Sequence, residues 1–280
     1  MKPRQYICSS HTISGVVPGG TVASRHGFAA RVQACAAVGY AGMCLHFRDY
    51  AEQRHAGMSD AELRTVLNIN GMKHVSIEFL TDWFMDGEAG EIARRNEAIA
   101  FQAANAFGAN VLNVGPDLAG RDIPIEIMRE RFAALCGRAA IHGIAIALEL
   151  VAWGNVREVD TALLMIDGVP NAGLVIDSWH IFRANVPLHH LKRIPAERVL
   201  CVQVNDAEAE PAGMLATDTM CRKLCGQGAF DLSAFVETLD AMGVQLPLSV
   251  EIISPEQSKR DLPEAASVSL ASARRCFDLP

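Results

Sequence analysis

The sequence predicts an α/β fold, a single-domain (β/α)8 TIM barrel, and three observations support this prediction. Short apolar or β-branched runs recur eight times along the 280 residues, and most of them precede a segment with helical periodicity. The length suits a barrel that forms as one unit. No Pro-, Gly- or Ser-rich linker divides the chain. We therefore expect one domain over residues 1–280.

Eight β-strands are expected at the apolar runs. In chain order these runs are residues 6–13, 42–47, 74–80, 109–115, 144–151, 173–179, 199–206 and 246–253. Repeated strand–helix units place their strands in a parallel sheet. Eight such units in a chain of this length favour a closed barrel over an open, doubly wound sheet.

The segments between the strands have helix start and stop signals. One helix starts at Ser59, with Glu62 in capping-box spacing, and ends at Gly71. Another is capped by Asp231, has apolar residues at steps of three and four, and ends at Gly243. Longer amphipathic helices are expected at residues 87–107 and 125–142.

Charge and hydropathy argue against nucleic-acid and membrane partners. The net charge is −7, and the basic residues are scattered without a Lys/Arg run that could follow a phosphate backbone. No apolar stretch is long enough to span a bilayer, and the first 15 residues lack the apolar core of a signal peptide. We therefore expect a cytoplasmic protein.

The cysteines and glycines argue against two kinds of cofactor site. The eight cysteines are dispersed and mostly lie in apolar runs, which is typical of reduced thiols. Cys221 and Cys225 lack the usual spacing of a zinc or redox motif. No strand is followed by a GxGxxG or GxxxxGK turn, so no nucleotide cofactor is expected.

Polar side chains lie near the ends of five predicted strands, and the active site of such a barrel lies at the carboxyl ends of its strands. These side chains are Glu78, Glu149, Asp177, Gln203 with Asn205, and Glu251. Converging buried carboxylates are unfavourable unless protons, basic partners or a cation neutralise them. Three basic residues follow in the loops, and we expect them to be too few and too far away to pair with every acid: His180, Arg183 and Arg222.

A divalent metal would neutralise these acids. Glu149, Asp177, Gln203 and Glu251 could supply four oxygen ligands, a set that suits Mn²⁺ or Mg²⁺ better than a structural zinc, with Zn²⁺ or Co²⁺ as alternatives. The competing interpretation is that these residues are helix caps or hydrogen-bonded polar residues of the barrel core.

Five stretches carry a resemblance to a known family. They are "LELVAWGNVREVDTALLMID", "NAGLVIDSWHIFR", "VLCVQVNDA", "CGQGAFDL" and "LSVEII". In these stretches the chain resembles the xylose-isomerase-like TIM barrels, a superfamily of sugar phosphate isomerase/epimerase-like proteins that includes ketose 3-epimerases, inosose dehydratases and dehydroshikimate dehydratases. The N-terminal half is similar in the rhythm of its elements.

The resemblance implies a metal enzyme. It implies that Glu149, Asp177, Gln203 and Glu251 hold one divalent metal, that Glu149 and Glu251 act as acid and base, and that His180 contacts substrate. Many members have His in place of Gln203, and a neutral amide oxygen there implies weaker metal binding.

Further substrate contacts are expected from Arg222, His11, His46 and Trp153, although each could instead be a solvated, structural or packing residue. The expected partner is a small carbohydrate, and a homo-oligomer is left open.

The leading functional hypothesis is a metal-dependent isomerase or epimerase of a small keto sugar or polyol-derived ketone, acting through an enediolate. One rival is a lyase on the same scaffold, either a dehydratase or a 3-keto-glycoside deglycosidase. The other rival is a barrel that binds a sugar or a partner subunit without turnover.

Overall fold

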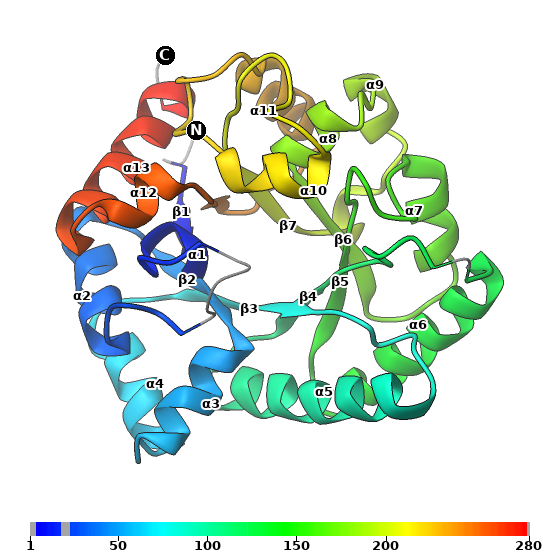
Figure 1. Ribbon diagram of the computed structural model, residues 1–280, viewed down its shortest axis with the longest axis horizontal. Coiled ribbons are helices and arrows are strands. Elements are labelled where there is room, and N and C mark those ends of the chain that lie inside the picture. The colour runs from blue at the N-terminus through cyan, green and yellow to red at the C-terminus, as the bar shows by residue number, and fades with distance from the viewer. Residues whose placement is uncertain (1–3, 18–22, 122, 279–280) are drawn as a thin grey trace.

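The computed structural model describes residues 4–17, 23–121 and 123–278, which form a closed barrel of eight parallel strands surrounded by helices (Figure 1). Each strand pairs with the next along the chain, and the eighth closes on the first. The predicted (β/α)8 TIM barrel is thus confirmed. The strands are β1 (Tyr6–Ser9), β2 (Gly42–His46), β3 (His74–Leu80), β4 (Val111–Val114), β5 (Ala145–Glu149), β6 (Ala172–Asp177), β7 (Val199–Val204) and β8 (Leu248–Val250).

The helices cover the outside of the barrel and extend the loops at its rim. They are α1 (Ser10–Ile13), α2 (Phe28–Val38), α3 (Phe47–His55), α4 (Asp60–Ile69), α5 (Gly87–Phe107), α6 (Ile125–Ala140), α7 (Val159–Ile166), α8 (Ser178–Arg183), α9 (Leu188–Leu191), α10 (Leu215–Asp218), α11 (Leu232–Ala241), α12 (Pro255–Lys259) and α13 (Leu262–Phe277). Two short 3-10 turns are η1 (Ala196–Arg198) and η2 (Thr219–Cys221). None of the helices described is long and apolar enough to cross a membrane.

The capping signals in the sequence act as expected. At the start of α4, the Ser59 hydroxyl accepts a hydrogen bond from the Glu62 backbone N–H, and the Glu62 carboxylate accepts one from the Ser59 N–H. At the start of α11, the Asp231 carboxylate accepts from the Ala234 N–H at 3.0 Å. These bonds satisfy backbone donors that have no partner within the helix.

Seven of the eight predicted strands end before their apolar runs do, and two of them show how the chain leaves the sheet. The run that starts at Tyr6 leaves the sheet after Ser9, and its last four residues form α1. The run that ends at Trp179 leaves the sheet after Asp177, because the Asp177 carboxylate accepts from the Trp179 N–H and caps α8. In both places a short polar side chain marks the change from strand to helix.

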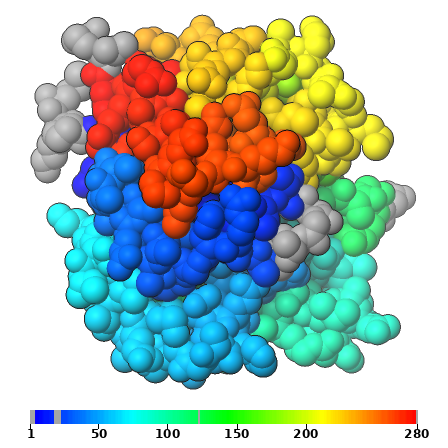
Figure 2. All heavy atoms as spheres, turned by 60° about the vertical axis from the view of Figure 1, so that its left-hand side comes forward, coloured from blue at the N-terminus to red at the C-terminus, as the bar shows by residue number. Residues whose placement is uncertain are grey.

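The two ends of the chain meet on one side of the barrel. Figure 2 shows this face, where the C-terminal residues in orange and red pack against the N-terminal segments in blue. The Tyr40 hydroxyl lies 2.9 Å from the Ser269 hydroxyl of α13, and the Tyr6 hydroxyl lies 2.7 Å from the Asp278 carboxylate. Helix α13 therefore closes the ring of helices beside β1.

A buried ion pair fixes the first helices near the rim. Arg31 of α2 is fully buried, and its Nη2 and Nη1 donate to the Asp49 carboxylate of α3 at 2.7 and 3.0 Å. The Ser10 hydroxyl of α1 donates to the same carboxylate at 2.9 Å. The Asp49 carboxylate thus joins three helices. Among the described residues, Arg31 is its one charged partner.

We predict that Arg31→Met destabilises the protein by about 3–5 kcal/mol, because it leaves the Asp49 charge buried without a partner. The double variant Arg31→Met/Asp49→Asn should recover part of this loss, since the stranded charge is gone. Denaturant unfolding of the three proteins measures the effect. Equal losses in the single and double variants would contradict this account.

Candidate active site

Four of the predicted strand-end residues, Glu78, Glu149, Gln203 and Glu251, line one cavity of about 230 Å³ at the carboxyl ends of the strands. Asp177 and Asn205 are fully buried and do not line it. Its polar wall contains Glu78, Glu149, His180, Gln203, Arg222 and Glu251, with His11 and Thr219 beside them. Its apolar wall contains Phe79, Leu118, Val151, Trp153, Ala216, Met220 and Ile253. The cavity therefore offers a polar face and an apolar face to a small molecule.

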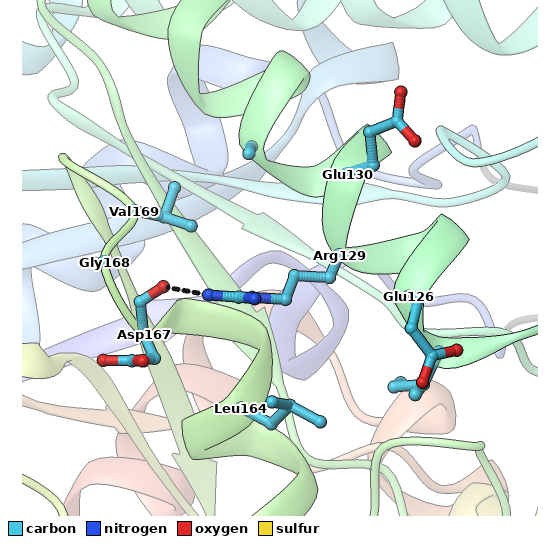
Figure 3. Close-up of a pocket in the computed structure, with 9 residues that line it drawn as sticks. Glu126, Arg129, Glu130, Leu164, Asp167, Gly168 and Val169 are labelled. Carbon is cyan, nitrogen blue, oxygen red and sulfur yellow. Dashed lines mark hydrogen bonds between the residues drawn. The ribbon is translucent and has the colours of Figure 1, made fainter.

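A larger groove of about 410 Å³ lies elsewhere, between α6 and α7 (Figure 3). Its side chains include Glu126, Glu130 and Leu164, and the Arg129 guanidinium there donates to the Asp167 carbonyl at 2.8 Å. None of the strand-end acids lines this groove. Size alone therefore does not identify the candidate site, and three of the predicted strand-end acids line the smaller cavity.

Asp177 is a fully bound carboxylate at the end of β6. Its Oδ1 accepts from the Trp179 N–H at 2.7 Å and from Asn205 Nδ2 at 3.0 Å. Its Oδ2 accepts from Arg222 Nη1 at 2.8 Å. Burial acts to raise the pKa of Asp177, but Arg222, His180 and the two hydrogen bonds outweigh it, so this pKa is lowered.

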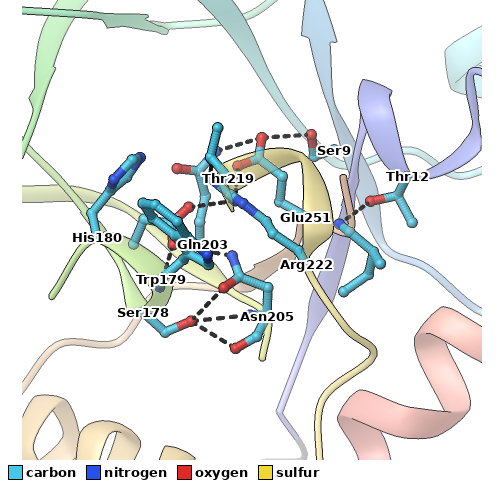
Figure 4. A network of polar contacts seen from close by, with 12 residues as sticks. Ser9, Thr12, Ser178, Trp179, His180, Gln203, Asn205, Thr219, Arg222 and Glu251 are labelled. Atoms are coloured by element: carbon cyan, nitrogen blue, oxygen red, sulfur yellow. Dashed lines mark hydrogen bonds and ion pairs between the residues drawn. The ribbon is translucent and has the colours of Figure 1, made fainter. Parts of the chain in front are cut away.

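Glu251 directly follows β8 and has donors on both oxygens (Figure 4). Oε1 accepts from Ser9 Oγ at 2.9 Å and from Gln203 Nε2 at 3.0 Å, and Oε2 accepts from Arg222 Nη1 at 2.6 Å. Burial raises the pKa of Glu251 well above its usual range, with Arg222 acting in the opposite direction.

Glu78 of β3 is a further carboxylate in the wall of the cavity. It accepts from Ser9 Oγ at 3.1 Å and from Cys44 Sγ at 2.9 Å. Burial raises the pKa of Glu78 to about 7. Ser9 has a single hydroxyl hydrogen between Glu78 and Glu251, so it donates to one of the two acids at a time.

The two ring nitrogens of His180 have different neighbours. The Ala152 N–H donates to Nδ1 at 3.3 Å, so Nδ1 acts as an acceptor. Nε2 lies 3.3 Å from Glu149 Oε1. Nε2 of His180 is thus the ring nitrogen that lies next to the Glu149 carboxylate.

The donor set fits a divalent metal. Atoms of Glu149, Asp177 and His180 lie within 4.8 Å of one another and are buried. Gln203 donates through Nε2 to Glu251, whereas its buried Oε1 has no hydrogen-bond partner among the described residues. An acceptor without a partner beside three carboxylates is the arrangement that an oxygen-preferring cation would satisfy.

Arg222 corrects one expectation from the sequence. We expected the basic residues to be too few and too far along the loops to pair with every acid, but Arg222 alone reaches both Asp177 and Glu251. Its Nη2 donates to Thr219 Oγ1 at 3.2 Å, and its guanidinium lies 5.7 Å from the centre of the Trp179 ring. Arg183 instead pairs with Asp218 at 2.7 Å, away from these acids.

The other predicted contact residues divide into two groups. His11 and Trp153 line the cavity. His46 does not line it; its Nδ1 accepts from the Arg48 N–H and caps α3. Burial is the main cause that lowers the pKa of His11 to about 4 and that of His46 to about 3, so both rings are uncharged at neutral pH.

The sequence did not reveal two residues that position the site. Ser9, which bridges Glu78 and Glu251, was hidden inside an apolar run expected to continue as a strand. The Asp206 carboxylate accepts from the backbone N–H groups of Gly226, Gly228 and Phe230 and so holds the loop that carries Arg222. The glycine-rich stretch "CGQGAF" was the available signal for this loop.

Two curated proteins are similar in sequence. A 3-dehydroshikimate dehydratase of Pseudomonas aeruginosa is 27% identical over 236 residues, which is 80% of this chain and 36% of that protein. An inosose isomerase of Bacillus subtilis is 32% identical over 128 residues, which is 44% of this chain and 45% of that protein. The chain thus spans less than half the length of these curated relatives in each match.

Solved structures share the fold. The IolI protein, crystallised with a bound zinc atom, matches with a TM-score of 0.85 at 20% identity over 98% of both chains. A D-allulose 3-epimerase of Methylomonas sp., in complex with D-allulose, matches with a TM-score of 0.71 at 18% identity over 99% of this chain and 98% of that one.

The family itself is recognised along most of the sequence. Residues 32–276 match the family described as xylose isomerase-like TIM barrel, so the resemblance inferred from the strand-end stretches is confirmed. The chain belongs to the xylose isomerase-like TIM barrel family.

Proposed function

We propose that this protein is a divalent-metal-dependent isomerase or epimerase of a small keto sugar or polyol-derived ketone. The observation that carries the proposal is that Glu149, Gln203 and Glu251 line one cavity, with Asp177 close to Glu149. The buried Gln203 Oε1 has no hydrogen-bond partner among the described residues. The inosose isomerases among the relatives support it, because an inosose is a polyol-derived ring ketone.

Glu149, Asp177, Gln203 and Glu251 are the proposed metal ligands. Their oxygen atoms suit Mn²⁺ or Mg²⁺, with Zn²⁺ or Co²⁺ as alternatives. A bound divalent ion would polarise the substrate carbonyl and lower the energy of the enediolate. The zinc in the IolI structure supports a divalent ion in this fold.

Glu149 and Glu251 are the proposed acid and base. They come from different strands: Glu149 ends β5 and Glu251 directly follows β8. Removal of the hydrogen next to the carbonyl by one glutamate, and return of a proton by the other, would invert a carbon centre. Return of the proton to the neighbouring carbon would exchange aldose and ketose.

The remaining polar residues would orient these groups and the substrate. His180 Nε2 would direct Glu149 or a substrate oxygen, and Arg222 would hold Asp177 and Glu251 in place. His11 and Trp153 would contact the substrate from the cavity wall. His46, whose ring centre lies 6.1 Å from that of His11, would act by fixing the His11 ring.

A lyase is the second candidate, and one observation favours it. The match to the 3-dehydroshikimate dehydratase extends over 80% of this chain. The same removal of a proton next to a carbonyl leads to elimination when a leaving hydroxyl or glycosidic oxygen occupies the next carbon. A dehydratase or a 3-keto-glycoside deglycosidase would use the same two glutamates, so the product distinguishes the reactions.

A barrel that binds without turnover is the third candidate. It would not explain why several acids lie together around one cavity.

We predict about one equivalent of divalent metal per chain, and at least about tenfold weaker metal binding in Glu251→Gln, because loss of a direct ligand should exceed the effect of outer-shell changes. Glu78→Gln is the matched control, since it makes the same change in the same cavity wall outside the ligand set. Elemental analysis and calorimetric titration with Mn²⁺ measure both. Equal weakening in the two variants would remove the basis for this ligand set.

We predict that the metal-loaded protein incorporates deuterium from D2O into the C–H bond next to the carbonyl of a ketone substrate. Glu149→Gln should slow this exchange by about 10²–10⁴-fold, the usual effect of a general base. NMR detects the exchange, and ultraviolet absorbance of an unsaturated product would identify a lyase. If no ketose, inosose or keto-glycoside exchanges with the loaded protein, the enediolate mechanism is wrong.

A further inference from the structure

We propose that Arg183 and Asp218 form a latch on the loop between β7 and α11, and that this latch positions the part of the cavity wall that contacts the organic substrate. The inference rests on the proposed function and adds two positioning residues to it. It follows from the contacts of the two residues, from the side chains that the loop brings to the cavity, and from the way in which the rest of the loop is held.

Arg183 is the fixed half of the latch. It ends α8, and its side chain is 5% exposed. Nε donates to Asp218 Oδ2 at 2.7 Å, and Nη1 donates to the Ala209 carbonyl at 3.2 Å. The guanidinium carbon lies 5.1 Å from the centre of the Phe230 ring. One buried side chain of α8 thus contacts both the beginning and the end of residues 209–218.

Asp218 is the buried end of a segment that is otherwise mostly exposed. Residues 208–214 are exposed, whereas the Asp218 side chain is 3% exposed. Its Oδ1 accepts from the Ala212 N–H at 2.7 Å, and among the described residues Arg183 is its one charged partner. A buried carboxylate is strongly unfavourable without its cation. Removal of Arg183 should therefore release Asp218 together with the segment that it holds.

The residues next to Asp218 in the chain form part of the cavity wall. Ala216 precedes it by two positions, and Thr219 and Met220 directly follow it. All three line the cavity, where Thr219 lies on the polar side (Figure 4). Neither Arg183 nor Asp218 lines the cavity. The latch therefore acts on a substrate through the positions of these neighbours.

The second half of the loop has anchors of its own. The Arg222 N–H donates to the Ile253 carbonyl at 3.0 Å, and Lys223 and Asp206 exchange two backbone hydrogen bonds of 2.7 and 3.1 Å. The Asp206 carboxylate holds the glycine-rich stretch that follows. Loss of the latch should therefore free residues 208–220 and leave Arg222 in place. The latch thus controls the wall that meets the substrate separately from the proposed metal ligands.

The first test compares Arg183→Met with Arg138→Met by hydrogen–deuterium exchange. Arg138 pairs with Glu97 across α5 and α6, and neither residue lines the cavity, so this variant breaks an ion pair elsewhere. We expect the hydrogen-bonded amides of residues 212–218 to exchange at least about tenfold faster in Arg183→Met, and those of residues 222–231 to change by less than about twofold. Arg138→Met should leave both segments unchanged.

Two outcomes of this experiment would overturn the latch. One is that residues 212–218 exchange at the same rate in the two variants. The other is that Arg183→Met accelerates residues 212–218 and 222–231 alike, because Arg183 would then stabilise the whole loop or the whole protein.

The second test measures KM, kcat and Mn²⁺ affinity of the metal-loaded protein. Arg183→Met should raise KM for the ketone substrate at least about tenfold and change kcat and Mn²⁺ affinity by less than about threefold, since a misplaced wall weakens binding of substrate and transition state alike. The double variant Arg183→Met/Asp218→Asn should raise KM no further, because both changes act through one contact. A KM equal to that of the wild type, an equal loss of Mn²⁺ affinity, or effects of the two changes that multiply would overturn the inference.

A failure of this inference is distinguishable from a failure of the proposed function. If the wild-type protein exchanges no ketone hydrogen with D2O, the proposed function fails, and the amide exchange of residues 212–218 still decides whether the latch exists. If the wild type acts on a ketone and Arg183→Met has the same KM, the inference alone fails.

Discussion

The contact of one guanidinium nitrogen of Arg222 with both Asp177 and Glu251 is the interaction on which the site depends. These two acids end different strands and would repel each other in a buried rim. Their shared donor is held in turn by the loop that follows β7. There Asp206 and Lys223 form an antiparallel bridge next to Arg222, and a Cβ at Gly228 would come within 2.1 Å of the Ala207 carbonyl oxygen. The absence of a side chain at Gly228 thus lets this loop pack closely against Asp206 and Ala207.

The barrel, and the acids within it, could be predicted from the sequence because both follow from local periodicity. Apolar runs of strand length, separated by helices with recognisable caps, fix eight parallel strands whose carboxyl ends meet at one rim. Glu149, Gln203 and Glu251 therefore line one cavity although the sequence separates them widely, and Arg222 links Glu251 to the buried Asp177. The position of these residues at strand ends is enough to predict that they lie close together.

Arg222, Ser9 and His46 could not be placed in this way, because their contacts depend on loop paths and side-chain directions. Ser9 bridges two acids only because the chain turns into α1 directly after it. His46 uses Nδ1 to cap α3 instead of facing the cavity. Asp177 shows that the alternatives of cap and site residue are compatible, since Oδ1 caps α8 while Oδ2 binds Arg222.

The polar atoms that the protein leaves without partners indicate what the site binds. Gln203 Oε1 and Arg222 Nε are both buried, both belong to residues of the cavity wall, and both lack hydrogen-bond partners among the described residues. One is an acceptor that a cation can satisfy, and the other is a single donor that an oxygen atom can satisfy. A ligand in the cavity would therefore meet one acceptor and one donor that have no partner among the described residues.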